Sequence, residues 1–95
     1  MRSTVTVDPR TDLVYVGKDD EAMLTVYEPS SLLALDRVEL PAPASYLAVD
    51  ELENVLLSVI PSVGVVAVLE LTTRRMRAVL PAGKEPYDLA FAGGR

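Results

Sequence analysis

Residues 66–70 are Val66-Ala67-Val68-Leu69-Glu70, and 42 positions earlier the chain contains Leu24-Thr25-Val26-Tyr27-Glu28. Both are short apolar runs that end at a glutamate, which is typical of a β-strand followed by a turn. The same spacing relates Val7-Asp8 to Val49-Asp50, and Leu13-Val14-Tyr15 to Val55-Leu56-Leu57. The sequence therefore contains an internal repeat with this spacing.

A third copy of the repeat begins near the end of the chain, where Leu89-Ala90-Phe91 matches Leu47-Ala48-Val49. The spacing differs at one place, because Leu40-Pro41 matches Leu80-Pro81, which lies 40 positions later. This match predicts that the register of the repeat slips by two residues near its fourth apolar run.

Each complete copy contains four apolar runs separated by turn residues. The runs cover residues 4–7, 13–16, 23–27 and 33–40 in the first copy, residues 46–49, 54–60, 65–71 and 76–80 in the second, and residues 87–91 beyond it. Asp8 and Pro9 suit the start of a type I turn, because proline fixes φ at its second position. Residues 30–39 also fit a helical period, but their counterpart at 72–80 does not, so we interpret them as a strand.

Four strands in about 40 residues are the pattern of one blade of a β-propeller. Residues 65–69 are apolar without interruption, which indicates burial on both faces of a sheet. A blade meets this condition because it packs between two neighbours, whereas a self-contained sandwich of two sheets would leave polar outer faces. We therefore predict an all-β chain with two four-stranded antiparallel propeller blades, at about residues 4–40 and 45–80. The first strand of a third blade is expected at about residues 86–92, so the propeller is incomplete or is completed by an oligomer.

Several segments resemble the YVTN family of β-propeller repeats. Residues 5–17 are similar to the opening of that repeat, in which an apolar strand, an Asp-Pro turn and a Tyr-Val strand follow one another. Residues 24–31 resemble its third strand and turn, and residues 80–91 resemble its link into the next blade. The second copy departs from the family pattern, because Leu57-Ser58 replaces the Tyr-Val pair and Asp50-Glu51 replaces Asp-Pro.

The resemblance implies a rigid, disc-shaped domain that binds partners on its flat faces. Two blades are fewer than the four to eight of known propellers, and a lone pair would expose large apolar faces to water. We therefore expect the partners to be other propeller blades from the same or another chain, so that the chain is a homo-oligomer or a fragment of a larger protein. Proteins that the chain resembles are often exported, but its first residues contain no apolar segment of signal-peptide length, so localisation stays open.

The composition excludes several kinds of site. The 95 residues include no His and no Cys, so the chain cannot by itself form a Ser–His–Asp or Cys–His arrangement, a disulfide or a usual zinc site. A net charge of −5 argues against nucleic acid as a partner. The longest apolar run, residues 63–69, is too short to span a membrane. We expect no catalytic residue, no cofactor and no bound metal.

Four residues are our candidates for binding a partner: Lys84, Glu85, Tyr87 and Asp88. They lie in the predicted link between the second and third blades, close to the flat face on which propellers often bind. Gly83 and Pro86 in the same link are explained by turn geometry alone.

Two charged clusters have simpler interpretations. Asp19-Asp20-Glu21 lacks the ligand spacing of a calcium loop, and we interpret it as a solvated acidic turn. Arg74-Arg75-Met76-Arg77 falls at the predicted outermost strand, where charges prevent pairing between sheet edges.

Two functions are compatible with these observations. In the first, the chain is a non-catalytic propeller segment that serves as a structural or protein-binding module. In the second, it belongs to a larger propeller enzyme, resembling an oxidoreductase or a lactonase, whose catalytic groups lie outside these residues.

Overall fold

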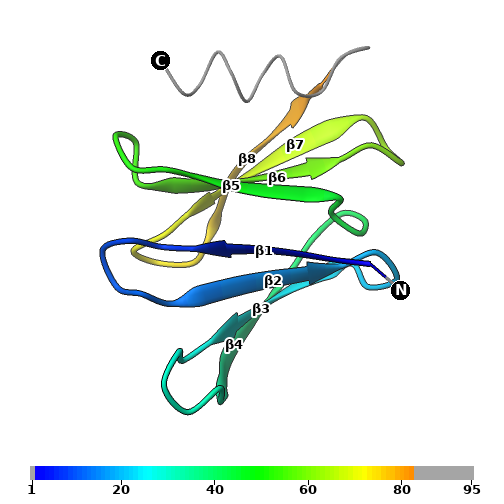
Figure 1. The fold of residues 1–95 in the computed structure, drawn as a ribbon. Helices are drawn as coiled ribbons and strands as arrows, with labels where there is room; N and C mark the ends of the chain where they lie inside the picture. Colours follow the sequence, from blue (N-terminus) through cyan, green and yellow to red (C-terminus); the bar gives the residue numbers. More distant parts are fainter. Residues whose placement is uncertain (1, 83–95) are drawn as a thin grey trace.

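The computed structural model describes residues 2–82, which form two four-stranded antiparallel sheets (Figure 1). Sheet 1 contains β1 (Ser3–Val7), β2 (Val14–Lys18), β3 (Met23–Tyr27) and β4 (Ala34–Glu39). Sheet 2 contains β5 (Tyr46–Asp50), β6 (Val55–Ile60), β7 (Val65–Glu70) and β8 (Met76–Pro81). In both sheets the strands are paired in sequence order.

The predicted all-β fold with two four-stranded antiparallel sheets is confirmed. The strand interpretation is confirmed for residues 34–39, which form β4, whereas residues 30–33 belong to the turn before it. The strand expected at residues 86–92 lies outside the described residues. Residues 2–82 form no helix, and so none that is long and apolar enough to cross a membrane.

Four tight turns repeat the same backbone geometry in the two sheets. Asp12, Leu32, Asn54 and Arg74 all have a positive φ, between 56° and 63°. Asn54 follows Asp12, and Arg74 follows Leu32, at the spacing of the sequence repeat. The residue that opens each turn also recurs, because the backbone oxygen of Glu28 accepts a hydrogen bond from the Leu32 amide at 2.8 Å, and that of Glu70 accepts one from the Arg74 amide at 2.8 Å.

The side chains that open the turns between the first two strands of each sheet also recur at this spacing. Asp8 accepts a hydrogen bond from the Arg10 amide, and Asp50 accepts one from the Leu52 amide. An aspartate that bonds the backbone two residues later stabilises a turn locally. The turn that the sequence predicts at Asp8 is therefore present, and Asp50 forms its counterpart.

The register of strand pairing keeps the spacing of the repeat through the fourth strand, so the predicted slip of two residues is wrong. Leu24 pairs with Val38 in sheet 1, and Val66 pairs with Leu80 in sheet 2. Leu80 is therefore the counterpart of Val38 and not of Leu40.

The hydrogen bonds after the fourth strands agree with this register. The Leu40 amide donates to the backbone oxygen of Ala22, and the Ala82 amide donates to that of Gly64. Both the donors and the acceptors are related by the repeat spacing, so Ala82 is the counterpart of Leu40. The Leu-Pro match that suggested a shorter spacing is a coincidence of composition.

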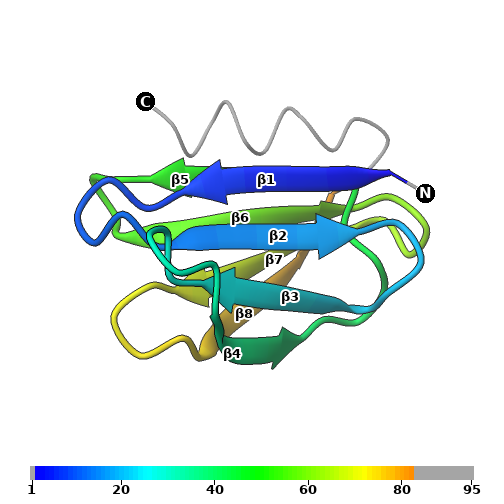
Figure 2. The ribbon, with the colours of Figure 1, turned by 60° about the horizontal axis from the view of Figure 1, so that its bottom comes forward.

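The two sheets approach each other most closely at their first strands. The backbones of β1 and β5 are in close contact, and Figure 2 shows both strands pointing in the same direction. Figure 1 shows β4 and β8 diverging from this line of contact. The sheets therefore form a wedge that is narrow at β1 and β5 and open at the opposite edge.

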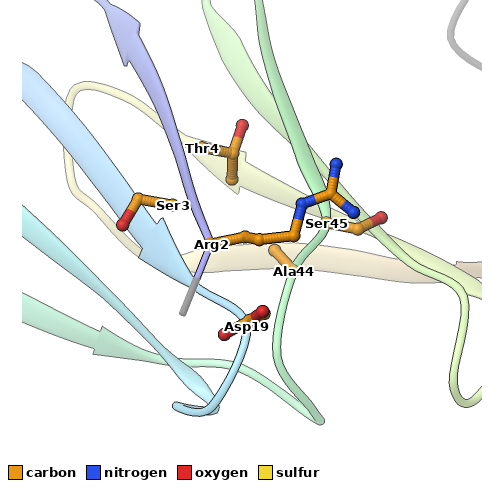
Figure 3. Close-up of a pocket in the computed structure, with 6 residues that line it drawn as sticks. All are labelled: Arg2, Ser3, Thr4, Asp19, Ala44 and Ser45. Carbon is orange, nitrogen blue, oxygen red and sulfur yellow. The ribbon is translucent and has the colours of Figure 1, made fainter.

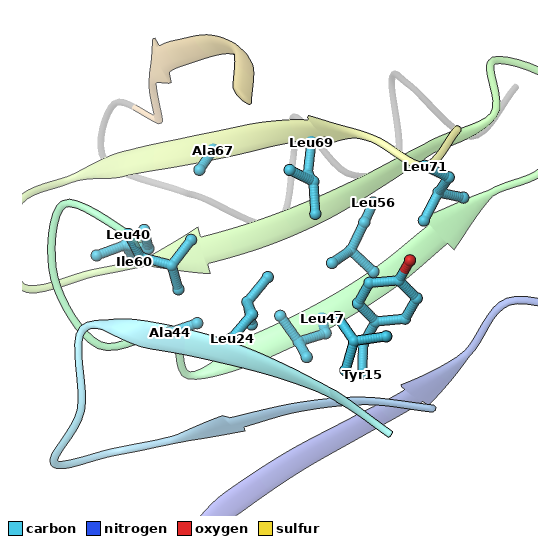
Figure 4. Close-up of a cluster of buried hydrophobic side chains, with 11 residues drawn as sticks. Tyr15, Leu24, Leu40, Ala44, Leu47, Leu56, Ile60, Ala67, Leu69 and Leu71 are labelled. Carbon is cyan, nitrogen blue, oxygen red and sulfur yellow. The ribbon is translucent and has the colours of Figure 1, made fainter. Parts of the chain in front are cut away.

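The core lies between the sheets and is built mainly from leucine, with alanine, isoleucine, valine and one tyrosine (Figure 4). Its members are Tyr15, Leu24, Val26, Leu40, Ala44, Leu47, Leu56, Ile60, Ala67, Leu69 and Leu71. Both sheets contribute side chains, so neither sheet can bury its apolar residues without the other. The hydrophobic effect of this burial is the main force that joins the two sheets.

We expect Leu56→Ala to destabilise the fold by about 2–5 kcal/mol, because Leu56 is fully buried and its truncation leaves a cavity. The matched control is Leu52→Ala, since Leu52 is 81% exposed, and its effect should stay within about 0.5 kcal/mol. Urea unfolding followed by circular dichroism measures both. If Leu56→Ala does not fold, Ile60→Val should still show a loss of about 0.5–1.5 kcal/mol. Equal effects at Leu56 and Leu52 would contradict the described core.

Candidate interaction surface

The four predicted binding residues, Lys84, Glu85, Tyr87 and Asp88, lie outside the described residues. The surfaces that the structure does describe are the outer face of each sheet, the seam between the sheets and the turns at their ends.

The side of sheet 1 that points away from sheet 2 has an apolar centre, and we call this side the outer face. Side chains alternate between the two faces of a strand. Since Tyr15, Leu24 and Val26 are buried against sheet 2, their neighbours in the strands point outward. The centre of the outer face consists of Val5, Val7, Val14, Val16, Met23, Thr25, Tyr27 and Leu35, and its margin of Ser3, Lys18, Arg37 and Glu39.

Three aliphatic side chains of the outer face are exposed to water to a large extent. The exposed fractions are 57% for Val5, 47% for Val7 and 50% for Leu35. The strand pairing places Val5 beside Val16, and Val7 beside Val14, so the apolar side chains are contiguous across β1 and β2. A contiguous apolar face of this kind is typical of a surface that another protein covers.

The outer side of sheet 2 differs from this face. Val59 and Val66 are buried there and form a small cluster with Ala82, whereas Tyr46 and Leu80, at the two ends of the same cross-strand row, are 54% and 43% exposed. Exposed apolar side chains are therefore present on the outer side of sheet 1 and, on that of sheet 2, at the two ends of this row.

At the open edge of the wedge, one ion pair joins the two sheets. The Arg74 guanidinium, in the turn between β7 and β8, donates a hydrogen bond of 3.0 Å to the Asp36 carboxylate on β4. This hydrogen bond, together with one from the Arg37 amide, holds the pKa of Asp36 below its ordinary value. Both side chains remain partly exposed, so we regard the pair as a positional link and not as a major source of stability.

The Tyr15 hydroxyl lies close to this ion pair. Tyr15 is fully buried, and its hydroxyl makes no hydrogen bond within the described residues. Burial raises the pKa of Tyr15, and the positive charge of Arg74 opposes that effect without cancelling it. Figure 4 shows the hydroxyl pointing along the core toward Leu71. The Tyr15 ring therefore fills the core, and its hydroxyl lies near the Arg74 guanidinium.

The role of Arg74 differs from the sequence interpretation, in which this residue belonged to an edge-protecting cluster. That interpretation suits Arg77, whose guanidinium pairs with Glu70 at 3.0 Å on sheet 2 itself. Arg74 instead reaches the facing sheet from a turn position with a positive φ. Its contact depends on a residue 38 positions away, and no local pattern marks it.

A pocket of about 330 Å³ lies between the start of β1 and the link into β5 (Figure 3). Its lining is polar and mostly exposed, and consists of Arg2, Ser3, Thr4, Asp19, Ala44 and Ser45. Figure 3 shows the Arg2 side chain extending past Ala44 toward Ser45. One cation and one carboxylate offer a small polar ligand no strong net charge, so the pocket is a weaker candidate site than the outer face.

The acidic turn at residues 19–21 is exposed, as the sequence predicts. Lys18 pairs with Glu21 across it at 3.9 Å. In the described part of the chain, no group of three acidic side chains is arranged to hold a metal ion.

Comparison of the chain with known protein families found no family that matches it. A search of curated proteins likewise found no match.

We expect the Asp36–Arg74 pair to stabilise the fold only while Asp36 is ionised. The pKa of Asp36 is lowered in the fold, so its contribution is complete above the unfolded value of about 3.9 and is lost as the pH falls through the lower folded value. The difference in unfolding free energy between the native chain and Asp36→Asn should therefore shrink as the pH falls below about 4. Urea unfolding over a pH series measures this difference. In an Arg74→Gln background the difference should be much smaller at every pH, and a pH-independent difference would contradict the pairing.

Proposed function

We propose that this chain is a non-catalytic β-propeller segment of YVTN type, which acts as a structural or protein-binding module by stacking against further blades. The observation that carries the proposal is the exposed apolar outer face of sheet 1. Water-exposed Val5 and Val7 cost free energy that a covering sheet would recover.

The arrangement of the two sheets supports this proposal. The strands of each sheet are paired in sequence order. The first strands of the two sheets lie side by side and point in the same direction. Both features agree with propeller blades arranged around a common axis. The divergence of β4 from β8 also agrees with a radial arrangement. In an ordinary sandwich the two sheets would instead stay about 10 Å apart over their whole width.

The repeated geometry supports it as well. Turns, strand pairing and the irregularity in the pairing of the last two strands all recur at the spacing of the sequence repeat. A chain that repeats one supersecondary unit buries its faces by stacking neighbouring units. The same principle predicts that a free apolar end face recruits a further unit.

We expect the chain to associate through the outer face of sheet 1. Size-exclusion chromatography with light scattering over a series of concentrations should show a mass that rises above the 10.3 kDa of one chain. Val5→Glu should weaken the association by about tenfold or more, because it places a charge in an apolar interface. Leu52→Glu, at an exposed turn away from this face, is the matched control and should leave the association unchanged. A folded chain that stays at 10.3 kDa at every concentration would overturn the proposed function.

A further inference from the structure

Each sheet has two different faces, and the sequence repeat shows which faces correspond. Strand pairing forms several cross-strand rows on the outer face of sheet 1, and the central row spans all four strands. The corresponding row of sheet 2 points inward, toward sheet 1. The first row is Val5, Val16, Thr25 and Arg37, and the second is Leu47, Ser58, Ala67 and Val79.

The other two faces correspond in the same way. The inward row of sheet 1 is Thr4, Gly17, Leu24 and Val38, and its counterpart on the outer side of sheet 2 is Tyr46, Val59, Val66 and Leu80. The interface within the chain therefore joins one kind of face to the other kind. It does not join two equivalent faces.

The inward row of sheet 2 shows how far this type of face is buried when another sheet packs on it. Leu47 is 4% exposed, Ser58 and Ala67 are fully buried, and Val79 at the end of the row is 46% exposed. On the corresponding outer face of sheet 1, Val5 is 57% exposed. The outer face of sheet 1 thus corresponds to a face of sheet 2 of which three residues in this row are buried against the facing sheet.

We propose that the outer face of sheet 1 binds a second copy of this chain, through the outer side of that copy's sheet 2, in a head-to-tail arrangement. The inference rests on the proposed function, since it specifies the partner and the orientation of the association proposed above. Val59 and Val66 are already buried, so the contact on sheet 2 centres on the exposed Tyr46 end of its row.

The contact within the chain indicates which residues meet between copies. Thr4 of β1 and Ser45, just before β5, line the same pocket where the sheets converge. By the repeat spacing, the counterpart of Ser45 in sheet 1 is Ser3, and the counterpart of Thr4 in sheet 2 is Tyr46. In a contact between copies, these two counterparts take the places of Ser45 and Thr4. Ser3 of one copy is therefore expected beside Tyr46 of the next copy.

An interface between unlike faces has a defined consequence for assembly. Its two surfaces differ, so each contact joins one surface of a copy to the other surface of the next copy. Repeated head-to-tail contacts form a ring if the rotation closes and a filament if it does not. The expected products are therefore closed rings of two or more copies, or filaments.

Cysteine cross-linking tests the orientation, because the native chain contains no cysteine. The double variant Ser3→Cys/Tyr46→Cys, treated with a short bis-maleimide, should form covalent species at two or more times the chain mass. The single variants Ser3→Cys and Tyr46→Cys should remain at the mass of one chain. The matched control Ser3→Cys/Leu52→Cys should form no such species, since Leu52 lies in an exposed turn.

Each other outcome is informative when light scattering is measured on the same samples. Cross-linked dimers of either single variant would mean that like faces meet, which overturns the head-to-tail arrangement and leaves the proposed function intact. Association without any cross-link would also overturn the arrangement alone. Absence of both association and cross-links would overturn the inference together with the proposed function.

Discussion

The structure depends on the packing of two unlike apolar faces between sheets 1 and 2. Tyr15 and Leu24 from sheet 1 meet Leu56 and Leu69 from sheet 2, and all four are fully buried. Sheet 1 is apolar at the centre of both of its faces, so packing against sheet 2 covers only one of them. Packing against sheet 2 buries the inner face of sheet 1 and leaves its apolar outer face exposed to water.

The turns make this packing possible because they fix the register of each sheet. A slip of one residue would exchange the buried and exposed faces of a strand. Asp8 and Asp50 hold one type of turn, and Glu28 and Glu70 hold the other. Leu32 and Arg74 adopt a positive φ although neither residue type favours it, which shows that the turn geometry outweighs local preference. The repeat is thus preserved along the chain as backbone geometry more closely than as residue identity.

This difference explains how much of the fold could be predicted. The apolar runs indicate where the strands lie, and the carboxylates at the turns indicate where the strands end. The strands and their division into two sheets could therefore be predicted from the sequence. The Leu-Pro match at the shorter spacing led to a wrong prediction of the register of the fourth strand. It rests on residue identity, whereas the register is set by the hydrogen bonds between strands. The contact of Arg74 with Asp36 could not be predicted, since it depends on where the second sheet lies. For the same reason the pattern of continuous apolar residues located apolar faces but did not tell which of them stays uncovered.

The ion pair at the open edge distinguishes the interface within the chain from the one proposed between chains. The repeat places Ala78 in sheet 2 where Asp36 stands in sheet 1, and Leu32 in sheet 1 where Arg74 stands in sheet 2. Leu32 is 71% exposed, so an apolar side chain is available at the position from which Arg74 reaches its partner. The contact between copies would therefore replace an ion pair by apolar area at this edge. Salt screens exposed charges but not apolar burial, so the contact within the chain carries a salt-sensitive link that the proposed contact between chains would lack.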